Sequence, residues 1–247
     1  MKIALLSDIH ANLPAMEAAF ADVDSRKPDA VYCLGDLVGY NVWPNEVVQA
    51  IQKRNIATLA GNHDLKVSNP GSESQFEVTG KNYAYSIVGN AEREYLLTLP
   101  AHIRLEFQLN DEKLNVLFVH GSPRSVNEYL LEDMEETLLS EIMREANADV
   151  LCFGHSHKPY HRIINTGTNG ENYFRHAINI GSVGKPKDNS PLGCYVLLTI
   201  KADCSVKNKG ALKVEFIRFE YDVEKAAKAV EESPLPDDFA DMLRKGY

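Results

Sequence analysis

A layered α/β fold is predicted by two features of the 247-residue sequence. Short apolar runs alternate with segments of helical spacing in the first part of the chain, and hairpin-like segments follow from about residue 102 onward. The β-α-β alternation favours a parallel sheet covered by helices, and the hairpins favour a mixed or second sheet. Because no repeat, low-complexity tract or Pro/Gly-rich linker divides the chain, we expect one domain over residues 1–247.

Five apolar runs are predicted to be strands buried on both faces, because each is short, continuous and bounded by turn residues. They cover residues 3–6, 30–34, 56–60, 116–119 and 150–153. Cys33 and Cys152 lie inside two of these runs, and the four cysteines form no C-x-x-C pair. We therefore interpret these two cysteines as small core residues.

Helices are predicted over residues 14–24 and 131–146 from apolar side chains at three- and four-residue spacing. The first begins with Pro14, which suits a first helical turn. In the second, the spaced apolar residues are Leu131, Met134, Leu138, Ile142 and Ala146. Residues 75–99 are interpreted as a helical excursion and a candidate cap, and residues 223–232 and 239–245 as closing helices.

From His102 onward the pattern changes to that of hairpins. Strands are predicted over residues 103–109, 114–119, 160–164, 173–180, 194–200 and 212–219.

The charge balance limits the partners that we expect. The chain has 26 Lys and Arg against 35 Asp and Glu, a net charge of −9, so it repels the phosphate backbone and anionic lipid. We expect neither stable binding to duplex nucleic acid nor a membrane association. The N-terminal apolar segment, residues 3–6, is too short for a signal peptide or a membrane span, which predicts a cytoplasmic protein. The oligomeric state stays open.

Polar residues follow each of the five apolar runs. The segments are Ser7-Asp8-Ile9-His10, Gly35-Asp36, Gly61-Asn62-His63-Asp64, His120-Gly121-Ser122-Pro123 and Gly154-His155-Ser156-His157. Because the carboxyl ends of strands form the ligand crevice of open α/β sheets, these segments can converge on one site. Imidazoles and carboxylates without a thiolate suit catalytic divalent cations better than a closed structural zinc.

The order Asp-x-His, Gly-Asp, Gly-Asn-His-Asp, His and Gly-His-x-His resembles the calcineurin-like metallophosphoesterase superfamily over residues 1 to about 184. The segments at 8–14, 120–123 and 179–184 are similar to those of its small bacterial and archaeal phosphodiesterase branch. This resemblance implies two mixed β-sheets packed as a sandwich and flanked by helices, a four-layer fold.

The resemblance also implies a centre of two divalent metal ions. Asp8, His10 and His157 would hold one cation, Asn62, His120 and His155 the other, and Asp36 would bridge both. We expect manganese first, with Fe, Zn, Ni, Co or Mg as alternatives. Two cations about 3.5 to 4 Å apart would clamp a phosphate and supply hydroxide near neutral pH.

The leaving oxygen of a phosphate ester needs a proton, and His63 is the candidate general acid. It follows Asn62 directly and has no metal assigned to it. Asp64 is predicted either to orient His63 or to cap the next helix. Asn12 and Arg124 are possible substrate contacts, and Tyr40, Trp43 and the aromatic residues of 83–95 are candidates to stack on a base.

These implications predict a dimetal phosphoesterase that hydrolyses phosphodiester bonds, nucleotide-like ones among them, by attack of a metal-bridging hydroxide on phosphorus. Serine/threonine phosphatases and symmetrical dinucleoside tetraphosphatases carry Asp-Arg three residues after the Gly-Asp aspartate, where this chain has Gly39-Tyr40. The missing guanidinium favours a diester over a monoester. The alternatives are a phosphomonoesterase, a protein or dinucleoside polyphosphate phosphatase, and a catalytically silent binding scaffold. A DNA nuclease is disfavoured by the net charge.

Overall fold

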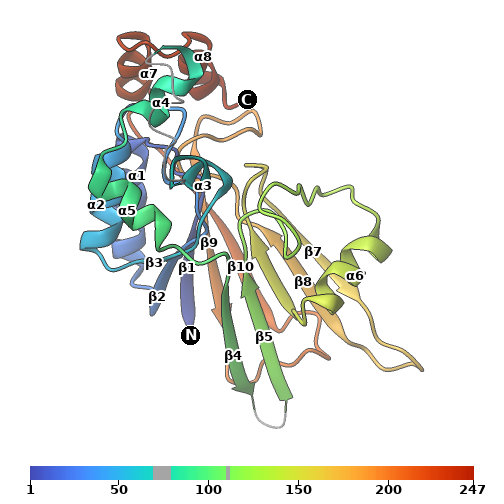
Figure 1. The fold of residues 1–247 in the computed structure, drawn as a ribbon. Coiled ribbons are helices and arrows are strands. Elements are labelled where there is room, and N and C mark those ends of the chain that lie inside the picture. The colour runs from blue at the N-terminus through green and yellow to red at the C-terminus, as the bar shows by residue number, and fades with distance from the viewer. Residues whose placement is uncertain (69–78, 110–111) are drawn as a thin grey trace.

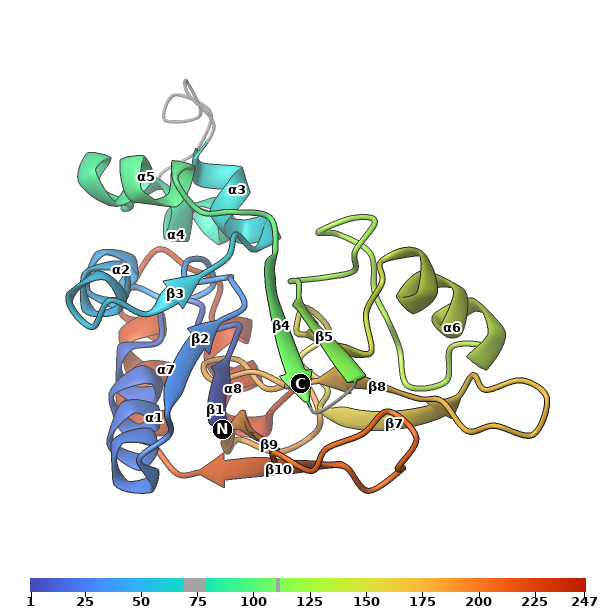
Figure 2. The ribbon, with the colours of Figure 1, turned by 90° about the horizontal axis from the view of Figure 1, so that it is seen from below.

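Two five-stranded mixed sheets lie face to face in the computed structural model, which describes residues 1–68, 79–109 and 112–247. Helices lie on the outer side of each sheet (Figures 1 and 2). The predicted sandwich of two mixed sheets flanked by helices is confirmed.

The first sheet has the strand order β10-β9-β1-β2-β3. Its strands are β10 (Leu212–Phe219), β9 (Gly193–Ile200), β1 (Lys2–Leu6), β2 (Ala30–Cys33) and β3 (Ala57–Thr58). Strands β1, β2 and β3 are parallel and are connected by helices α1 (Leu13–Arg26) and α2 (Pro44–Lys53). Strand β9 pairs antiparallel with both β1 and β10, which makes the sheet mixed.

The second sheet has the strand order β4-β5-β6-β8-β7. Its strands are β4 (Ile103–Leu109), β5 (Glu112–Phe118), β6 (Val150–Phe153), β8 (Phe174–Asn179) and β7 (Tyr160–Asn165). Strands β5, β6 and β8 are parallel, and helix α6 (Glu136–Glu145) connects β5 to β6. The outer strands β4 and β7 are antiparallel to their neighbours and match the predicted hairpins within a few residues.

Successive residues of the central strands face different layers, because side chains alternate along a strand. Ile3 and Leu5 of β1 pack in the core between the sheets with residues such as Phe118, whereas Ala4 and Leu6 face the helices. In β5 and β6, the second set of alternate residues packs against α6. Burial on both faces explains why these strands are continuous apolar runs in the sequence.

Helix α6 differs from its prediction. It begins at Glu136 rather than at residue 131, and Glu135 before it has the extended backbone angles φ −51° and ψ 129°. Leu131 and Leu138 are 44% and 40% exposed, whereas the neighbouring Leu139 is fully buried. Ile142 of the predicted face is buried, and Met134 and Ala146 pack against the same core, so the prediction is wrong at Leu131 and Leu138 only.

Helix α2 was not predicted, although its sequence carries the same signals as α1. Both helices have a proline in the first turn, and α2 buries Val47, Val48 and Ile51 against the first sheet. The closing helices are confirmed as α7 (Val223–Glu231) and α8 (Asp238–Lys245). The four cysteines are free and buried, in agreement with the interpretation of Cys33 and Cys152.

The excursion predicted over residues 75–99 is helical where the structure describes it, whereas residues 75–78 lie outside the described residues. It contains a short 3-10 turn (Gly80–Asn82), α4 (Tyr83–Ser86) and α5 (Asn90–Leu97) and packs beside α3 (Asn62–Ser68). The buried guanidinium of Arg93 donates hydrogen bonds to the carbonyls of Val67, Tyr85 and Val88. Arg93 therefore holds α3, α4 and α5 together.

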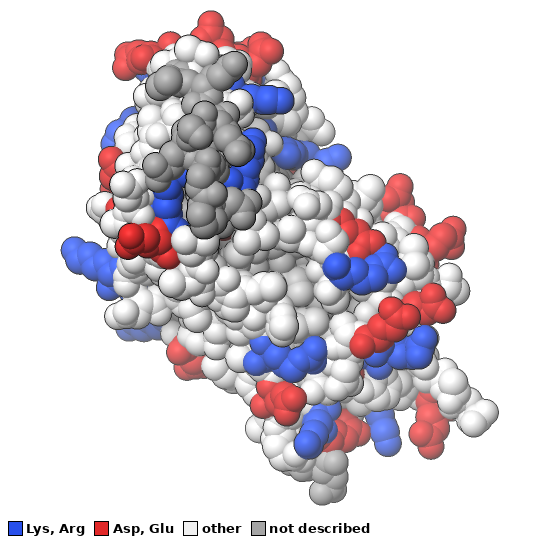
Figure 3. Space-filling view, in the orientation of Figure 1, with Lys and Arg blue, Asp and Glu red and all other residues white. Residues whose placement is uncertain are grey.

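Among the described residues, no helix is both long and apolar enough to cross a membrane. On the face shown in Figure 3, basic and acidic side chains of the described residues are interspersed, without a continuous basic stripe. This distribution agrees with the expectation that duplex nucleic acid is not a stable partner, which stays a prediction.

We predict that Arg93→Met lowers the free energy of unfolding by about 3 kcal/mol, because three buried carbonyls lose their charged donor. The matched control is Arg54→Met, which breaks an exposed ion pair with Asp24 and is expected to cost less than about 1 kcal/mol. Urea denaturation measures both values. Equal losses in the two variants would show that Arg93 does not join these helices.

Candidate metal centre

The polar segments that follow β1, β2, β3, β5 and β6 meet at one end of the sandwich, as predicted. Backbone hydrogen bonds join them: the Asp8 N–H donates to the Gly35 carbonyl at 3.0 Å, and the Gly154 N–H donates to the His120 carbonyl at 2.9 Å. The two sheets are also joined, because the His155 N–H donates to the Asp8 carboxylate at 3.1 Å. Side chains from residues 8 to 157 are thereby placed around one point.

The backbone is strained where it carries the predicted metal ligands. Five of them have a left-handed backbone with φ between 52° and 64°: Asp8, His10, Asp36, His155 and His157. Such angles are costly for residues other than glycine and concentrate at functional sites. Close packing adds a further constraint, because a Cβ atom on Gly61 would lie 2.1 Å from Oδ1 of Asp36. The fold therefore tolerates a free-energy cost in the backbone to direct these side chains toward the site.

A first cluster consists of Asp8, His10 and His157. Nε2 of His157 lies 3.0 Å from Oδ1 of Asp8 and 3.2 Å from Nε2 of His10. The Nδ1 atoms of the two histidines face the carbonyls of Val38 and Lys185, which are acceptors, so Nδ1 carries the proton in each ring. Both Nε2 lone pairs then face each other and the Asp8 oxygen.

A second cluster consists of Asp36, His120 and His155, with Asn62 beside it. Nε2 of His120 lies 3.2 Å from Oδ2 of Asp36 and 3.1 Å from Oδ1 of Asn62. Its Nδ1 faces the carbonyl of Leu34 at 2.8 Å, so Nε2 is the atom turned toward the two oxygens. The same Oδ2 atom of Asp36 lies 3.6 Å from Nε2 of His10 in the first cluster. Asp36 is therefore shared by both clusters.

Buried acceptors that face one another without a donor are costly, and both clusters concentrate lone pairs that positive charge would satisfy. Oδ1 of Asp8 has no hydrogen-bond partner although it is buried. A cation in each cluster would satisfy these lone pairs, and the donors are nitrogen and oxygen atoms that suit divalent metals. The residues present therefore fit two divalent cations.

The electrostatics of the site favour positive charge. Burial opposes ionisation of Asp36, but the imidazoles of His120 and His63 hold the pKa of Asp36 well below its usual range. Burial lowers the pKa of His10 well below its usual value, so this ring is neutral and able to coordinate. Burial and the neighbouring His120 lower the pKa of His155 to about 4. His10 and His155 are therefore neutral, as coordination requires. Burial opposes protonation of His120, but Asp36 raises the pKa of His120 to about 10, so a cation bound in the second cluster would replace the proton of this ring.

Asp64 has a role that differs from both predicted ones. It lies inside α3, fully buried, and its carboxylate accepts hydrogen bonds from the backbone N–H groups of Asp36 at 2.7 Å, Leu37 at 2.9 Å and Gly61 at 2.9 Å. It is not the N-cap of α3, and the described residues give it no contact with the His63 ring. Asp64 instead fixes the loop of Asp36 against the loop of Asn62. Burial and the nearby Asp36 raise the pKa of Asp64 to about 7.

His63 lies at the edge of both clusters and forms a third group of closely spaced ligand atoms with His10 and Asp36. Its Nε2 is 4.0 Å from Oδ2 of Asp36, and its Nδ1 is 2.6 Å from the hydroxyl oxygen of Tyr85. Its ring centroid is 4.8 Å from that of His10 and 4.9 Å from that of Tyr40. Burial lowers the pKa of His63, although the carboxylate of Asp36 opposes this shift, and burial raises the pKa of Tyr85. Because Tyr85 belongs to α4, its contact with His63 places part of the predicted helical excursion beside the site.

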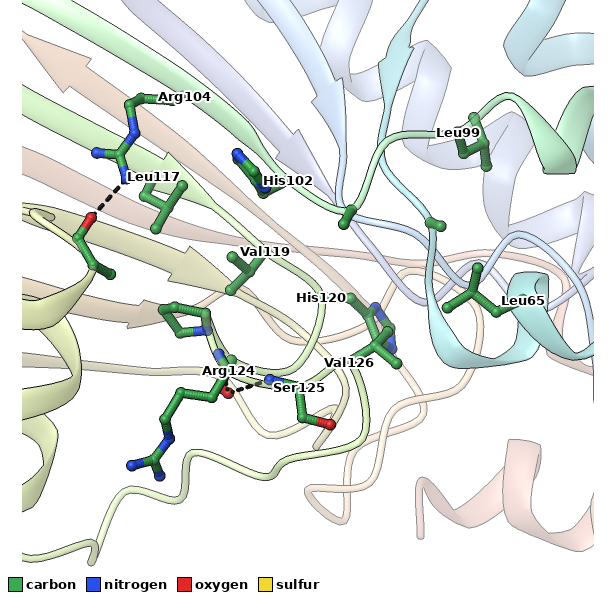
Figure 4. A pocket seen from close by; sticks show the side chains of 15 residues that line it. Leu65, Leu99, His102, Arg104, Leu117, Val119, His120, Arg124, Ser125 and Val126 are labelled. Carbon is green, nitrogen blue, oxygen red and sulfur yellow. Dashed lines mark hydrogen bonds between the residues drawn. The ribbon is translucent and has the colours of Figure 1, made fainter.

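The structure argues against Asn12 as a substrate contact. Asn12 is fully buried, its Oδ1 caps α1 by accepting from the Ala15 N–H, and its Nδ2 donates to the Gly184 carbonyl at 2.8 Å. Arg124 is exposed, and its guanidinium is paired with Glu128. Figure 4 shows the guanidinium of Arg124 pointing away from His120.

A cavity of about 360 Å³ lies beside the second cluster, with His120 in its wall (Figure 4). Its lining is mostly apolar and includes Leu65 of α3, Leu117 of β5 and Val126. The cavity is large enough to receive an organic group next to the phosphate position.

Sequence reasoning missed the loop after β8, which supplies two lysines to the site. The Lys185 carbonyl accepts from Nδ1 of His157, and the Lys185 and Lys187 ammonium groups lie 4.9 Å and 5.8 Å from the centroid of the Tyr40 ring. The motif at residues 179–184 marks the start of this loop but gives no role to the two lysines that follow it. The pairing of β8 with β6 and the backbone hydrogen bonds of Val183 and Gly184 to Ser7 and Asp8 place the loop at the site.

Comparison with known proteins agrees with this site. The model of the calcineurin-like phosphoesterase superfamily domain matches residues 1–203. An uncharacterized protein of Methanocaldococcus jannaschii is 30% identical over 259 residues, covering 99% of this chain and 98% of that protein.

Two solved structures are similar over the full length of the chain. A metallophosphoesterase from Sphaerobacter thermophilus is 25% identical with a TM-score of 0.74, and covers 100% of this chain and 99% of its own. A hypothetical protein from Pyrococcus horikoshii has the same fold, with 23% identity, a TM-score of 0.78 and coverage of 100% and 98%. From the domain match, the full-length relative and the two clusters of His and Asp, we conclude that the chain belongs to the calcineurin-like phosphoesterase superfamily.

Proposed function

We propose that this protein hydrolyses phosphodiesters, nucleotide-like ones among them, with two divalent cations bound between its sheets. The observation that supports this most directly is the shared carboxylate: Oδ2 of Asp36 lies 3.6 Å from Nε2 of His10 and 3.2 Å from Nε2 of His120. Asp8, His10 and His157 would hold one cation, and Asn62, His120 and His155 the other. Manganese is the first candidate, with Fe, Zn, Ni, Co and Mg as alternatives.

When bound, the two cations would supply Lewis acidity for the phosphate oxygens and lower the pKa of a coordinated water to about 7. The chain's own residues supply orientation. The carbonyl acceptors at Nδ1 of His10, His120 and His157 keep each Nε2 turned to the centre, and hydrogen bonds of this kind also make an imidazole a better ligand. Asp64 holds the Asp36 loop in place by accepting from the backbone N–H groups of Asp36, Leu37 and Val38.

His63 is the proposed proton donor for the leaving oxygen. The protonated ring is the acid: its Nδ1–H can donate to the hydroxyl oxygen of Tyr85 at 2.6 Å, which keeps the Nε2–H on the side that faces Asp36. Transfer of the Nε2 proton to the leaving oxygen then leaves a neutral imidazole. Tyr85 is thus a positioning residue for His63.

The preference for diesters rests on what surrounds the centre. Gly39 and Tyr40 provide no guanidinium, and Arg124 is paired with Glu128, so a dianionic monoester gains little besides the charge of the cations. The apolar cavity beside His120 offers a place for the second arm of a diester. A monoesterase would leave this cavity without a role.

We predict that Asp36→Asn removes most bound metal and nearly all turnover, because one residue serves both clusters. Metal content is measured by mass spectrometry after loading with manganese. Asp203→Asn, an exposed change of the same type, is the control and is expected to keep both cations. Two metals per chain at normal rates in the Asp36 variant would exclude the bridging role.

We predict that His63→Ala keeps both cations but loses about 10²-fold or more in kcat on alkyl esters. The loss should be much smaller for p-nitrophenyl esters, whose leaving group needs little protonation. Tyr85→Phe should show the same dependence on the leaving group with a smaller loss. If His63→Ala slows both ester types equally, the acid role is rejected.

We predict a higher kcat/KM for bis(p-nitrophenyl) phosphate than for p-nitrophenyl phosphate with the same metal, and no hydrolysis after chelation. Faster turnover of the monoester would support the phosphatase alternative. No turnover of either ester, of phosphopeptides or of dinucleoside polyphosphates with loaded protein would support the binding scaffold.

A further inference from the structure

We propose that Lys187 binds a non-bridging oxygen of the substrate phosphate and so supplies the fixed positive charge that Gly39-Tyr40 do not provide. This inference rests on the proposed function and identifies a residue outside the predicted site. It assigns phosphate recognition to the loop after β8, which lies 151 positions along the chain from Asp36.

The loop of Lys187 is attached directly to the metal centre. Its residues Val183 and Gly184 donate backbone hydrogen bonds to the carbonyls of Ser7 and Asp8, each at 3.0 Å. The Lys187 N–H donates to the carbonyl of the predicted ligand His157 at 3.4 Å. The backbone of Lys187 is therefore attached by hydrogen bonds to the segments that would hold the first cation.

The ammonium group of Lys187 lies over a ring that borders the site. It is 5.8 Å from the centroid of Tyr40, and the Tyr40 ring is 4.8 Å from the His10 ring and 4.9 Å from the His63 ring. Burial lowers the pKa of Lys187, and the carboxylates of Asp8 and Asp36 oppose this shift. The ammonium group therefore lies beside Tyr40, a ring that also contacts His10 and His63.

Within residues 1–68, 79–109 and 112–247, the Lys187 ammonium group has neither a hydrogen bond nor an ion pair. Lys185 differs, because its ammonium group donates to the carbonyl of Tyr247 at 3.3 Å. A half-buried charge without a partner is costly unless an anion completes it. Two dications against the two carboxylates of Asp8 and Asp36 would leave the centre positive, so the carboxylates could not be that partner. A phosphate between the cations and Lys187 would be.

The test is calorimetric titration of inorganic phosphate into manganese-loaded protein, with metal content measured for each variant. Lys187→Met should keep two cations per chain and bind phosphate about 10-fold or more weakly, as expected for loss of a charge-assisted hydrogen bond. Lys187→Arg should stay within about 3-fold of the original protein, because the charge is kept. Lys201→Met, an exposed lysine just beyond β9, is the control and should not change binding.

Hydrolysis of bis(p-nitrophenyl) phosphate gives a second readout, in which Lys187→Met should raise KM more than it lowers kcat. Unchanged phosphate affinity in Lys187→Met would overturn the assignment, and so would loss of metal, which would make Lys187 a support for His157. If the original loaded protein neither binds phosphate nor hydrolyses any ester, the proposed function fails as a whole. Binding that is equal in the original protein and Lys187→Met rejects the lysine alone.

Discussion

The mutual repulsion of buried lone pairs is the constraint around which this molecule is arranged. Nε2 of His10 and Nε2 of His157 are 3.2 Å apart, and Nε2 of His120 faces two acceptor oxygens at similar distances. Because each Nδ1 already faces a carbonyl, a neutral ring cannot relieve these contacts, and only added positive charge at Nε2, from a proton or a metal cation, can. Such a site is stable only when the surrounding structure holds it and when positive charge enters it.

The surrounding structure holds the site through backbone groups more than through side chains. The buried carboxylate of Asp64 collects N–H groups from the ends of β2 and β3, and the loop after β8 donates N–H groups to Ser7 and Asp8. The strands below these loops are packed on both faces, so their ends have little freedom. The rigid strands and the strained backbone of the segments that follow them together fix the directions of the ligand side chains.

The sequence was sufficient for the fold class and for the order of the polar segments, because both depend on local patterns. Continuous apolar runs report burial on two faces, and the residues directly after them report the carboxyl ends of strands. It was insufficient where the outcome depends on distant packing. Contact with the second sheet decides that Leu139 of α6 is buried while Leu138 is exposed. The hydrogen-bond partners of Asp64 include the Asp36 N–H, 28 residues earlier in the chain. Asn12 looked available in the sequence but is enclosed by Gly184, 172 residues further on.

Because the ligands come from both sheets, bound cations would also affect the stability of the fold. Asp8, His10, Asp36 and Asn62 follow strands of the first sheet, whereas His120, His155 and His157 follow strands of the second. Each cluster therefore contains residues from both sheets. An ion bound in either cluster would cross-link the two sheets. Ligands that bind only the folded state add to its stability in proportion to the logarithm of their concentration. The free energy of unfolding of this protein would then rise with the concentration of divalent metal. Removal of metal would weaken the interface between the two sheets before it affected the pairing of strands within either sheet.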